Sequence, residues 1–330
     1  MAEINVKKES KLIDVLAAQV NHERLDSNVV EEANEIVSEL LKDPTPGNRH
    51  QIAQTVGFTI DKLQEHELDF LNSIADQKTI GYGDKAAFNV KTGGIKAYFQ
   101  AKGSTTRRSY VADRQVYVET EELSARPAIN IVDLRSGRVN MADLIREANR
   151  EMTNMKVAKV EQVLHDAIQN YSSPFYATGT GIVKATLDAQ IAYFHRLGAV
   201  TLLGDQAAVA QLTGVAGMVM NAGATSNIFT QFSPSMIDEA NANGYLGRYN
   251  GSNVISLVNT YHEGTTTPTL ATDWIYIIPA GGSADARNLK VVNGGNVNSL
   301  ESQSIDDMVF EIRLDQWLTK KSSHLTQKCV

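Results

Sequence analysis

NMADLIREANREMTNMKVAKVEQVLHDAIQN, residues 140–170, contains no glycine or proline. Apolar side chains recur along it at helical spacing: Met141, Leu144, Ile145, Ala148, Met152 and Met155, then Val160, Val163, Leu164, Ala167 and Ile168. Asn140 is a good N-cap residue, and Asp143 lies where a carboxylate favours the helix dipole. About thirty residues make a rod roughly 45 Å long, against about 11–12 residues for a mean globular helix. The stretch therefore predicts a helix that spans a flat or elongated body; a coiled-coil arm fits less well because the apolar phase drifts.

The first quarter of the chain is acidic and has helical patterns. Residues 1–75 contain 14 Asp and Glu but 7 Lys and Arg, so they carry the whole formal net charge of −7. We expect Ser10 to cap a first helix and Pro44-Thr45-Pro46-Gly47 to follow a second. The apolar stripes are Leu12, Ile13, Leu16 and Val20; Val30, Ala33, Val37, Leu40 and Leu41; and Ile60, Leu63, Leu71 and Ile74. These amphipathic helices need a partner surface, either the rest of the chain or another subunit.

Residues 80–134 are typical of a long two-stranded hairpin. Its expected strands are Ile95–Lys102 and Tyr110–Glu119, joined by the polar connector Gly103–Arg108. An isolated hairpin with so few large apolar residues is marginal in water, so we expect it to lie across something else. A short strand is expected at Ala128–Val132.

The rest of the chain alternates helical and strand patterns, which predicts an α+β lobe with a mixed sheet. Helices are expected at Thr186–Arg196 and Asp205–Gly214, and strands at Val200–Gly204, Asn253–Val258 and Trp274–Ile278. Met308–Trp317 alternates, with Phe310, Ile312 and Leu314 facing one way and Glu311, Arg313 and Asp315 the other.

Motifs for catalysis are missing from the sequence. The seven histidines form no HxxxH or HExxH pair, and there is no GxSxG elbow. Gly179-Thr180-Gly181 lacks the third glycine of a dinucleotide loop, because Lys184 stands there, so we expect a turn. Adjacent Asp306 and Asp307 would point to opposite faces of a strand. We therefore expect no enzyme activity, cofactor or metal.

Composition also bears on location. Cys329 is the only cysteine, so no internal disulfide forms and we expect an unpaired tail thiol. The start of the chain lacks the apolar stretch of a signal peptide, and no run approaches the roughly 18 apolar residues of a membrane span. We expect folding in a reducing cytoplasm, with no membrane partner.

One basic cluster outside the helices is the candidate functional site. Arg107, Arg108 and Arg114 lie on the predicted hairpin, and Glu119, Glu121 and Glu122 follow. They are either a solvated turn or a docking contact in which the tip of one subunit meets the acidic base of the next. Exposed ion pairs contribute little each, but repeated in a lattice they set orientation and register.

The order of these elements resembles that of HK97-like major capsid proteins of tailed bacteriophages. Two local stretches also resemble the family: Ala125–Leu134 leading into Met141–Ile145, and Ala240–Tyr249 followed by Asn253–Val258. The resemblance covers roughly residues 80–320 and implies an α+β fold. In it, residues 1–79 would be an acidic helical N-terminal arm, 80–134 the E-loop hairpin with an adjoining P-domain strand, and 135–170 the P-domain spine helix. Residues 171–285 would be a mixed α/β A domain, and 286–330 the closing P-domain strands and C-terminal tail.

It further implies a shell subunit that self-assembles into pentamers and hexamers around a phage genome. The E-loop would reach over a neighbour, and residues 1–75 would be a retained arm or, second, a scaffold removed by a protease. Expected partners are other copies, scaffold, portal or decoration proteins, and packaged double-stranded DNA bound without sequence specificity. The location would be the virion, and the host cytoplasm during assembly. Some relatives cross-link an E-loop lysine to a neighbour's asparagine; Lys96, Lys102, Asn293 and Asn296 are the candidates here.

Three other functions compete with this one. A cytoplasmic enzyme with an α+β catalytic lobe is disfavoured by the lack of any nucleophile, metal or phosphate motif. An encapsulin-like nanocompartment shell has the same fold, with a typically shorter hairpin and a cargo enzyme. Another phage structural subunit, such as a tail tube or sheath protein, fits a long helix after a long hairpin poorly.

Overall fold

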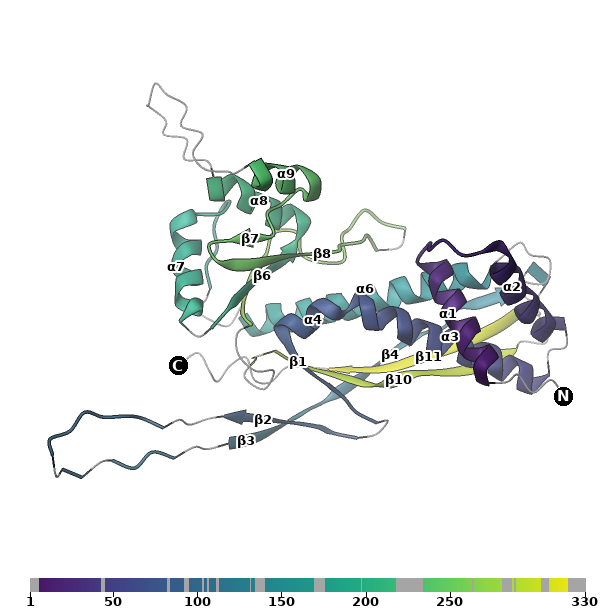
Figure 1. Ribbon diagram of the computed structural model, residues 1–330, viewed down its shortest axis with the longest axis horizontal. Coiled ribbons are helices and arrows are strands. Elements are labelled where there is room, and N and C mark those ends of the chain that lie inside the picture. The colour runs from purple at the N-terminus through teal and green to yellow at the C-terminus, as the bar shows by residue number, and fades with distance from the viewer. Residues whose placement is uncertain are drawn as a thin grey trace, which may run out of the picture.

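The computed structural model describes residues 6–42, 45–81, 84–91, 95–102, 104–105, 107–110, 113–130, 132–133, 140–168, 176–196, 198–217, 234–262, 264–280, 287, 289–303 and 309–319. Figure 1 shows an elongated body, a smaller lobe above one end of it and a hairpin that projects away from both. Asp306, Asp307 and Cys329 lie outside the described residues.

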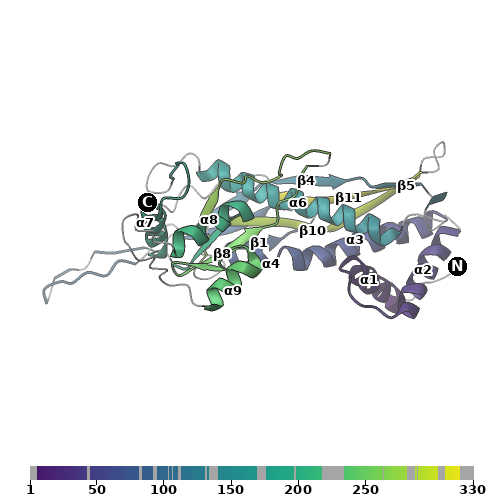
Figure 2. The same ribbon diagram turned by 90° about the horizontal axis from the view of Figure 1, so that it is seen from above.

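A long helix and a five-stranded sheet form the body. The helix α6 (Met141–Ile168) confirms the stretch that predicted it. The sheet runs β1 (Ala75–Thr79), β10 (Leu289–Gln303), β11 (Val309–Thr319) and β4 (Thr120–Ala125), and β5 (Ala128–Asn130) also pairs with β11. β1 and β10 are parallel, whereas β11 is antiparallel to β10, β4 and β5. Figure 2 shows α6 lying along this sheet.

The buried face of α6 follows most of the predicted stripe, including Leu164 in the second half of the helix. Met141, Ile145 and Met152 are buried against Phe310, Ile312 and Leu314 of β11, whose alternation is therefore confirmed. Met155 was expected in the stripe but is 49% exposed. Lys156 and Glu161 are buried instead, because polar partners from other elements meet them there.

The first three N-terminal helices belong to the same hydrophobic core, and the fourth belongs to a second one, in which Leu71 and Ile74 are buried with Leu164 of α6. These helices are α1 (Val6–Val20), α2 (Ser27–Lys42), α3 (Pro46–Glu67) and α4 (Asp69–Ile74). The expected stripes are buried at Leu12, Leu16 and Val20 of α1, at Ala33 and Leu40 of α2 and at Ile60 and Leu63 of α3. The partner surface is thus the rest of the chain, and the helices are no detached arm. Two expectations were wrong: Ser10 lies inside α1 rather than at its cap, and residues 75–79 form a strand.

The hairpin exists, but its paired strands lie nearer the body than predicted. β2 (Ala86–Lys91) pairs with β3 (Asp113–Val118). The strand expected at 110–119 is found as β3, whereas the strand expected at 95–102 was wrong, since the described residues among 95–110 have no ladder pairing. We call the described residues of 95–110 the distal hairpin. Its two arms still lie side by side, because the Lys96 backbone N–H donates to Ser109 Oγ at 3.1 Å.

The lobe has the expected mixed sheet. Its strands run β7 (Arg248–Tyr249), β8 (Ser252–Leu257), β6 (Val200–Asp205) and β9 (Ile275–Pro279), with β6 parallel to β8 and antiparallel to β9. Helices α7 (Lys184–His195), α8 (Gln206–Gly217) and α9 (Pro234–Asn243) surround it, as Figure 1 shows. Only glycine fits at position 204, because a Cβ there would lie 2.8 Å from the Trp274 carbonyl oxygen. Gly179-Thr180-Gly181 is a bend, as predicted.

Candidate functional site

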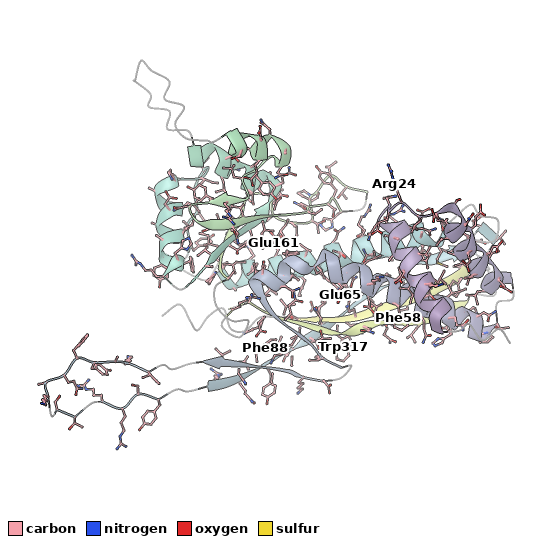
Figure 3. The ribbon with its side chains drawn as sticks, viewed as in Figure 1. Arg24, Phe58, Glu65, Phe88, Glu161 and Trp317 are labelled. Atoms are coloured by element: carbon pink, nitrogen blue, oxygen red, sulfur yellow. The ribbon has the colours of Figure 1, made fainter. Side chains whose placement is uncertain are left out.

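The distal hairpin presents apolar and cationic side chains to solvent. Phe99 is fully exposed, Ile95 is 79% exposed and Tyr110 is 72% exposed. Monomeric proteins seldom gather large apolar side chains on one projecting segment unless it binds something. Arg107 and Arg108 are also exposed there, so the structure places both predicted cations on this segment. Figure 3 shows the hairpin projecting from the body, with its side chains drawn as sticks and Phe88 labelled at the packed base.

The base of the hairpin, in contrast, is fixed to the sheet. Phe88 of β2 is buried with Val118 of β3 and Val292 of β10. Two ammonium groups lie over its ring, that of Lys78 at 4.7 Å and that of Lys290 at 5.4 Å from the centroid. Lys78 Nζ also donates to the Ala87 carbonyl oxygen at 2.6 Å. The exposed distal part is therefore carried by a firmly packed base.

A buried ion pair lies beneath this base. Asp76 of β1 and Lys290 of β10 are opposite each other in the parallel ladder, and Lys290 Nζ lies 2.6 Å from Asp76 Oδ2. Both side chains are almost completely buried. The charges lie out of water, so each depends on the other.

The predicted acidic half of the docking site is not on the hairpin. Arg114 lies on β3 and Glu119 just after it, both exposed, but Glu121 and Glu122 lie on β4 of the main sheet. Glu121 forms an ion pair with Lys159 of α6. Glu122 pairs with Arg313 of β11 at 3.0 Å. The expectation that all three glutamates form an acidic base on the hairpin was therefore wrong: two of them hold α6 and β11 against β4.

Glu161 joins α6 to the lobe. Its carboxylate accepts hydrogen bonds from the Ala271 backbone N–H, 3.2 Å from each oxygen, and from the Tyr276 hydroxyl at 3.2 Å. Burial raises the pKa of Glu161, while the two hydrogen bonds act to lower it. The lobe is thus attached to the long helix by a polar contact that apolar patterning does not reveal.

A cavity of about 370 Å³ lies between α7, β9 and the C-terminal end of α6. Asp273 is the only charged residue among its lining residues, and the aromatic rings of Phe194, Trp274 and Tyr276 contribute to its wall. Its described lining residues include no histidine, cysteine or lysine. Within the described residues, no group of three His, Cys, Asp or Glu side chains is placed to hold a metal ion.

A second projecting segment was not predicted from the sequence. After β8 the described residues 258–262 and 264–270 form a loop closed by Asn259 and Leu270, whose side chain and backbone exchange hydrogen bonds at 2.9 and 3.1 Å. Tyr261 and Pro268 form a bridge within it, and Val258 and Tyr261 are exposed. Its only sequence signal is a polar, threonine-rich stretch between two apolar strands.

Asp61 fastens α3 to β10. Its carboxylate oxygens lie 2.9 and 3.0 Å from the Val297 backbone nitrogen and accept its hydrogen. Burial raises the pKa of Asp61 to about 6, while the Val297 hydrogen bond and Lys156 act to lower it and Glu65 acts to raise it. The contact is next to the register shift of β10 between Gly294 and Asn298.

This raised pKa predicts a pH-dependent stability. The folded chain binds the Asp61 proton more tightly than the unfolded chain does. This protonation therefore contributes fully to the free energy of unfolding below about pH 4, and its contribution is lost as the pH rises through about 6. When the pH is lowered from 7 to 4.5, the free energy of unfolding of the wild type should therefore rise by about 1–2 kcal/mol more than that of Asp61→Asn, after allowance for solvent screening. Urea unfolding of the unassembled subunit at both pH values measures it. Parallel pH profiles for the two proteins would contradict the assignment.

Within the described residues, no helix is both long enough and apolar enough to cross a bilayer. The lysines considered for cross-linking, Lys96 and Lys102, are exposed on the distal hairpin. Asn293 is on β10 and its amide donates to Gln77 Oε1 at 3.0 Å, whereas Asn296 is exposed.

Comparison with solved structures identifies the fold. The chain is similar to the capsid of an empty GTA particle computed with C5 symmetry, with a TM-score of 0.51 and 11% identity over 77% of this chain and 86% of that one. A structure from Mycobacterium phage Cain is similar with a TM-score of 0.48 and 12% identity over 76% of this chain and 82% of that one. The mature capsid of bacteriophage PhiM1 is similar with a TM-score of 0.44 and 10% identity over 76% of this chain and 82% of that one. The expected HK97-like α+β capsid fold is confirmed.

Comparison of the sequence itself gives the family. No curated protein matches the chain. The family model described as "SPbeta prophage-derived putative capsid protein YonB" matches residues 6–321, nearly the whole chain. The chain belongs to this YonB family of prophage-derived capsid proteins.

Proposed function

We propose that this chain is the major subunit of a phage shell, self-assembled into pentamers and hexamers around double-stranded DNA. The observation that carries the proposal is the distal hairpin, a packed base that holds exposed Ile95, Phe99 and Tyr110 away from the body. An exposed apolar surface of this kind marks a site where another molecule binds. In a capsid family that molecule is a second copy of the chain.

Each part of the fold has its own role in this proposal. We propose that α6 and the five-stranded sheet act as the P domain, residues 171–285 as the A domain around the symmetry axes and the hairpin as the E-loop. The role is structural, with no catalytic step. Assembly takes place in the host cytoplasm, and scaffold, portal or decoration proteins are further partners.

Residues 1–75 serve as a retained arm in this proposal. The helices α1, α2 and α3 share one core with Ile145 and Met152 of α6, so a protease that removed them would expose that core. Mass spectrometry of mature particles should find subunits that keep these residues. A subunit that starts near residue 76 would assign them to the scaffold role.

The test removes the apolar surface of the hairpin without touching its base. Ile95→Ser, Phe99→Ser and Tyr110→Ser together should abolish shells, because these side chains would supply the apolar contact with the neighbouring subunit. They have little packing to lose in the single chain. The same subunit should keep its thermal midpoint within about 2 °C, since each exposed substitution changes stability by under about 0.5 kcal/mol. Negative-stain microscopy and thermal unfolding give the two measurements.

The matched control is Tyr117→Ser, an exposed aromatic on β3 outside the distal hairpin. It should leave shell yield largely unchanged. Normal shells from the triple variant would overturn the role given to the hairpin. Particles that contain an enzyme cargo in place of DNA would favour the encapsulin-like alternative. Subunits running above monomer size on a denaturing gel would revive the Lys96 or Lys102 cross-link.

A further inference from the structure

The distal hairpin is a cationic surface without an anion of its own. Residues 95–110 contain Lys96, Lys102, Arg107 and Arg108 and no Asp or Glu. All four side chains belong to exposed residues. None of them has an ion-pair partner in the described part of the chain.

Helix α2 is the matching acidic surface. It has four exposed glutamates, Glu31, Glu32, Glu35 and Glu39, and none of these has an ion-pair partner among the described residues. Glu31, Glu35 and Glu39 follow one another at i, i+4 spacing on one face of the helix. Like charges at this spacing repel by a few tenths of a kcal/mol per pair, so a cationic partner would relieve a standing repulsion.

The other exposed acidic groups near α6 and β4 are already engaged. Glu121 and Glu122 hold Lys159 and Arg313. On α6, Asp143 pairs with Arg146 and Glu147 pairs with Arg150. Docking a cationic hairpin on these residues would replace existing ion pairs, whereas docking it on α2 adds new ones.

The two surfaces match in length but cannot meet within one chain. An extended arm of eight residues, 95–102, spans about 26 Å, and the 16 residues of α2 span about 24 Å. Figures 1 and 2 both show the hairpin leaving one end of the molecule while α2 lies at the opposite end. A contact between them therefore needs a second copy.

We infer that the distal hairpin of one subunit docks along α2 of a neighbouring subunit, with its lysines and arginines against Glu31, Glu32, Glu35 and Glu39. The inference rests on the proposed shell function and names the surface that receives the hairpin. Exposed Val29 of α2, 38% exposed, offers an apolar contact beside the carboxylates. Since the hairpin and α2 are different surfaces, the contact is head-to-tail, and such contacts form rings when the rotation between neighbours closes.

A charge swap tests the pairing. Glu31→Lys with Glu35→Lys should raise the protein concentration needed for assembly about tenfold, and Arg107→Glu with Arg108→Glu should do the same. The four substitutions together should return the protein concentration needed for assembly close to the wild-type value. The control keeps the α2 reversal but adds Lys85→Glu and Arg248→Glu, two exposed cations elsewhere, which restores net charge without rescue.

Zero-length carbodiimide coupling supplies the second readout on wild-type particles. It joins an amine to a carboxylate only in direct contact, so Lys96 or Lys102 should couple to an α2 glutamate, and mixed isotope labels should show that the two peptides come from different subunits. Shells that form without this cross-link and without rescue would overturn the inference while leaving the proposed function intact. Wild-type protein that forms no shells would instead overturn the proposed function.

Discussion

Asp76→Ala should lower the free energy of unfolding of the subunit by about 3–5 kcal/mol. The substitution leaves the Lys290 ammonium buried, with its carboxylate partner at 2.6 Å removed. Hydration cannot compensate, because the Lys290 side chain is only 6% exposed. The Phe88 ring, 5.4 Å from the ammonium, offers it a weaker partner than a carboxylate. Urea unfolding of the unassembled subunit gives the measurement.

The double variant Asp76→Ala with Lys290→Met separates charge burial from packing. Removing both charges should recover most of the lost stability, because an apolar pair of similar volume is often as stable as a buried ion pair. A single variant that loses under about 1 kcal/mol, or a double variant as unstable as the single one, would mean that the pair does not hold β1 against β10.

Ile145→Ala should destabilise the subunit by about 3–4 kcal/mol. Ile145 is fully buried at the centre of the contact between α6, the N-terminal helices and β11. Truncation of a buried isoleucine loses its transfer free energy and leaves a cavity, which together cost about 2–5 kcal/mol. Thermal or urea unfolding of the unassembled subunit measures the loss.

Met155→Ala is the matched control on the same helix, since Met155 is about half exposed. Its effect should stay under about 0.5 kcal/mol. Equal losses for the two variants would show that α6 packs on a different face from the one described.

Sequence patterns predict α6 well but not all of its buried face. A 28-residue helix with apolar residues at helical spacing needs no information from elsewhere in the chain. Lys156 and Glu161, however, are buried because Gln64 and Tyr276, distant in sequence, contact them. A charged residue normally indicates an exposed position, and nothing local reveals such a partner.

Local patterns did not predict β1 or β10, for a similar reason, although the resemblance placed closing strands within residues 286–330. β1 reads Ala-Asp-Gln-Lys-Thr, and β10 contains Gly294, Gly295 and several asparagines. Neither has the alternation of a half-buried strand. Their polar side chains are accommodated by pairing, as Asp76 with Lys290 and Gln77 with Asn293 show.

The candidate site was predicted in part. Arg107 and Arg108 are on an exposed hairpin because a polar connector between two strand patterns favours a projecting turn. Glu121 and Glu122 follow the hairpin directly in sequence, but the chain enters the main sheet at Thr120, so they face cations of α6 and β11. Where a hairpin ends and a sheet begins depends on pairing with β11, which is nearly 200 residues away.

The most direct test of the shell function is electron cryomicroscopy of the purified, full-length wild-type chain. The fold and the exposed hairpin predict closed particles built of five-fold and six-fold capsomers. The map should show the long helix α6 in every subunit and the distal hairpin lying over a neighbouring subunit. A monodisperse monomer under all assembly conditions, or tubes without five-fold vertices, would contradict the shell function.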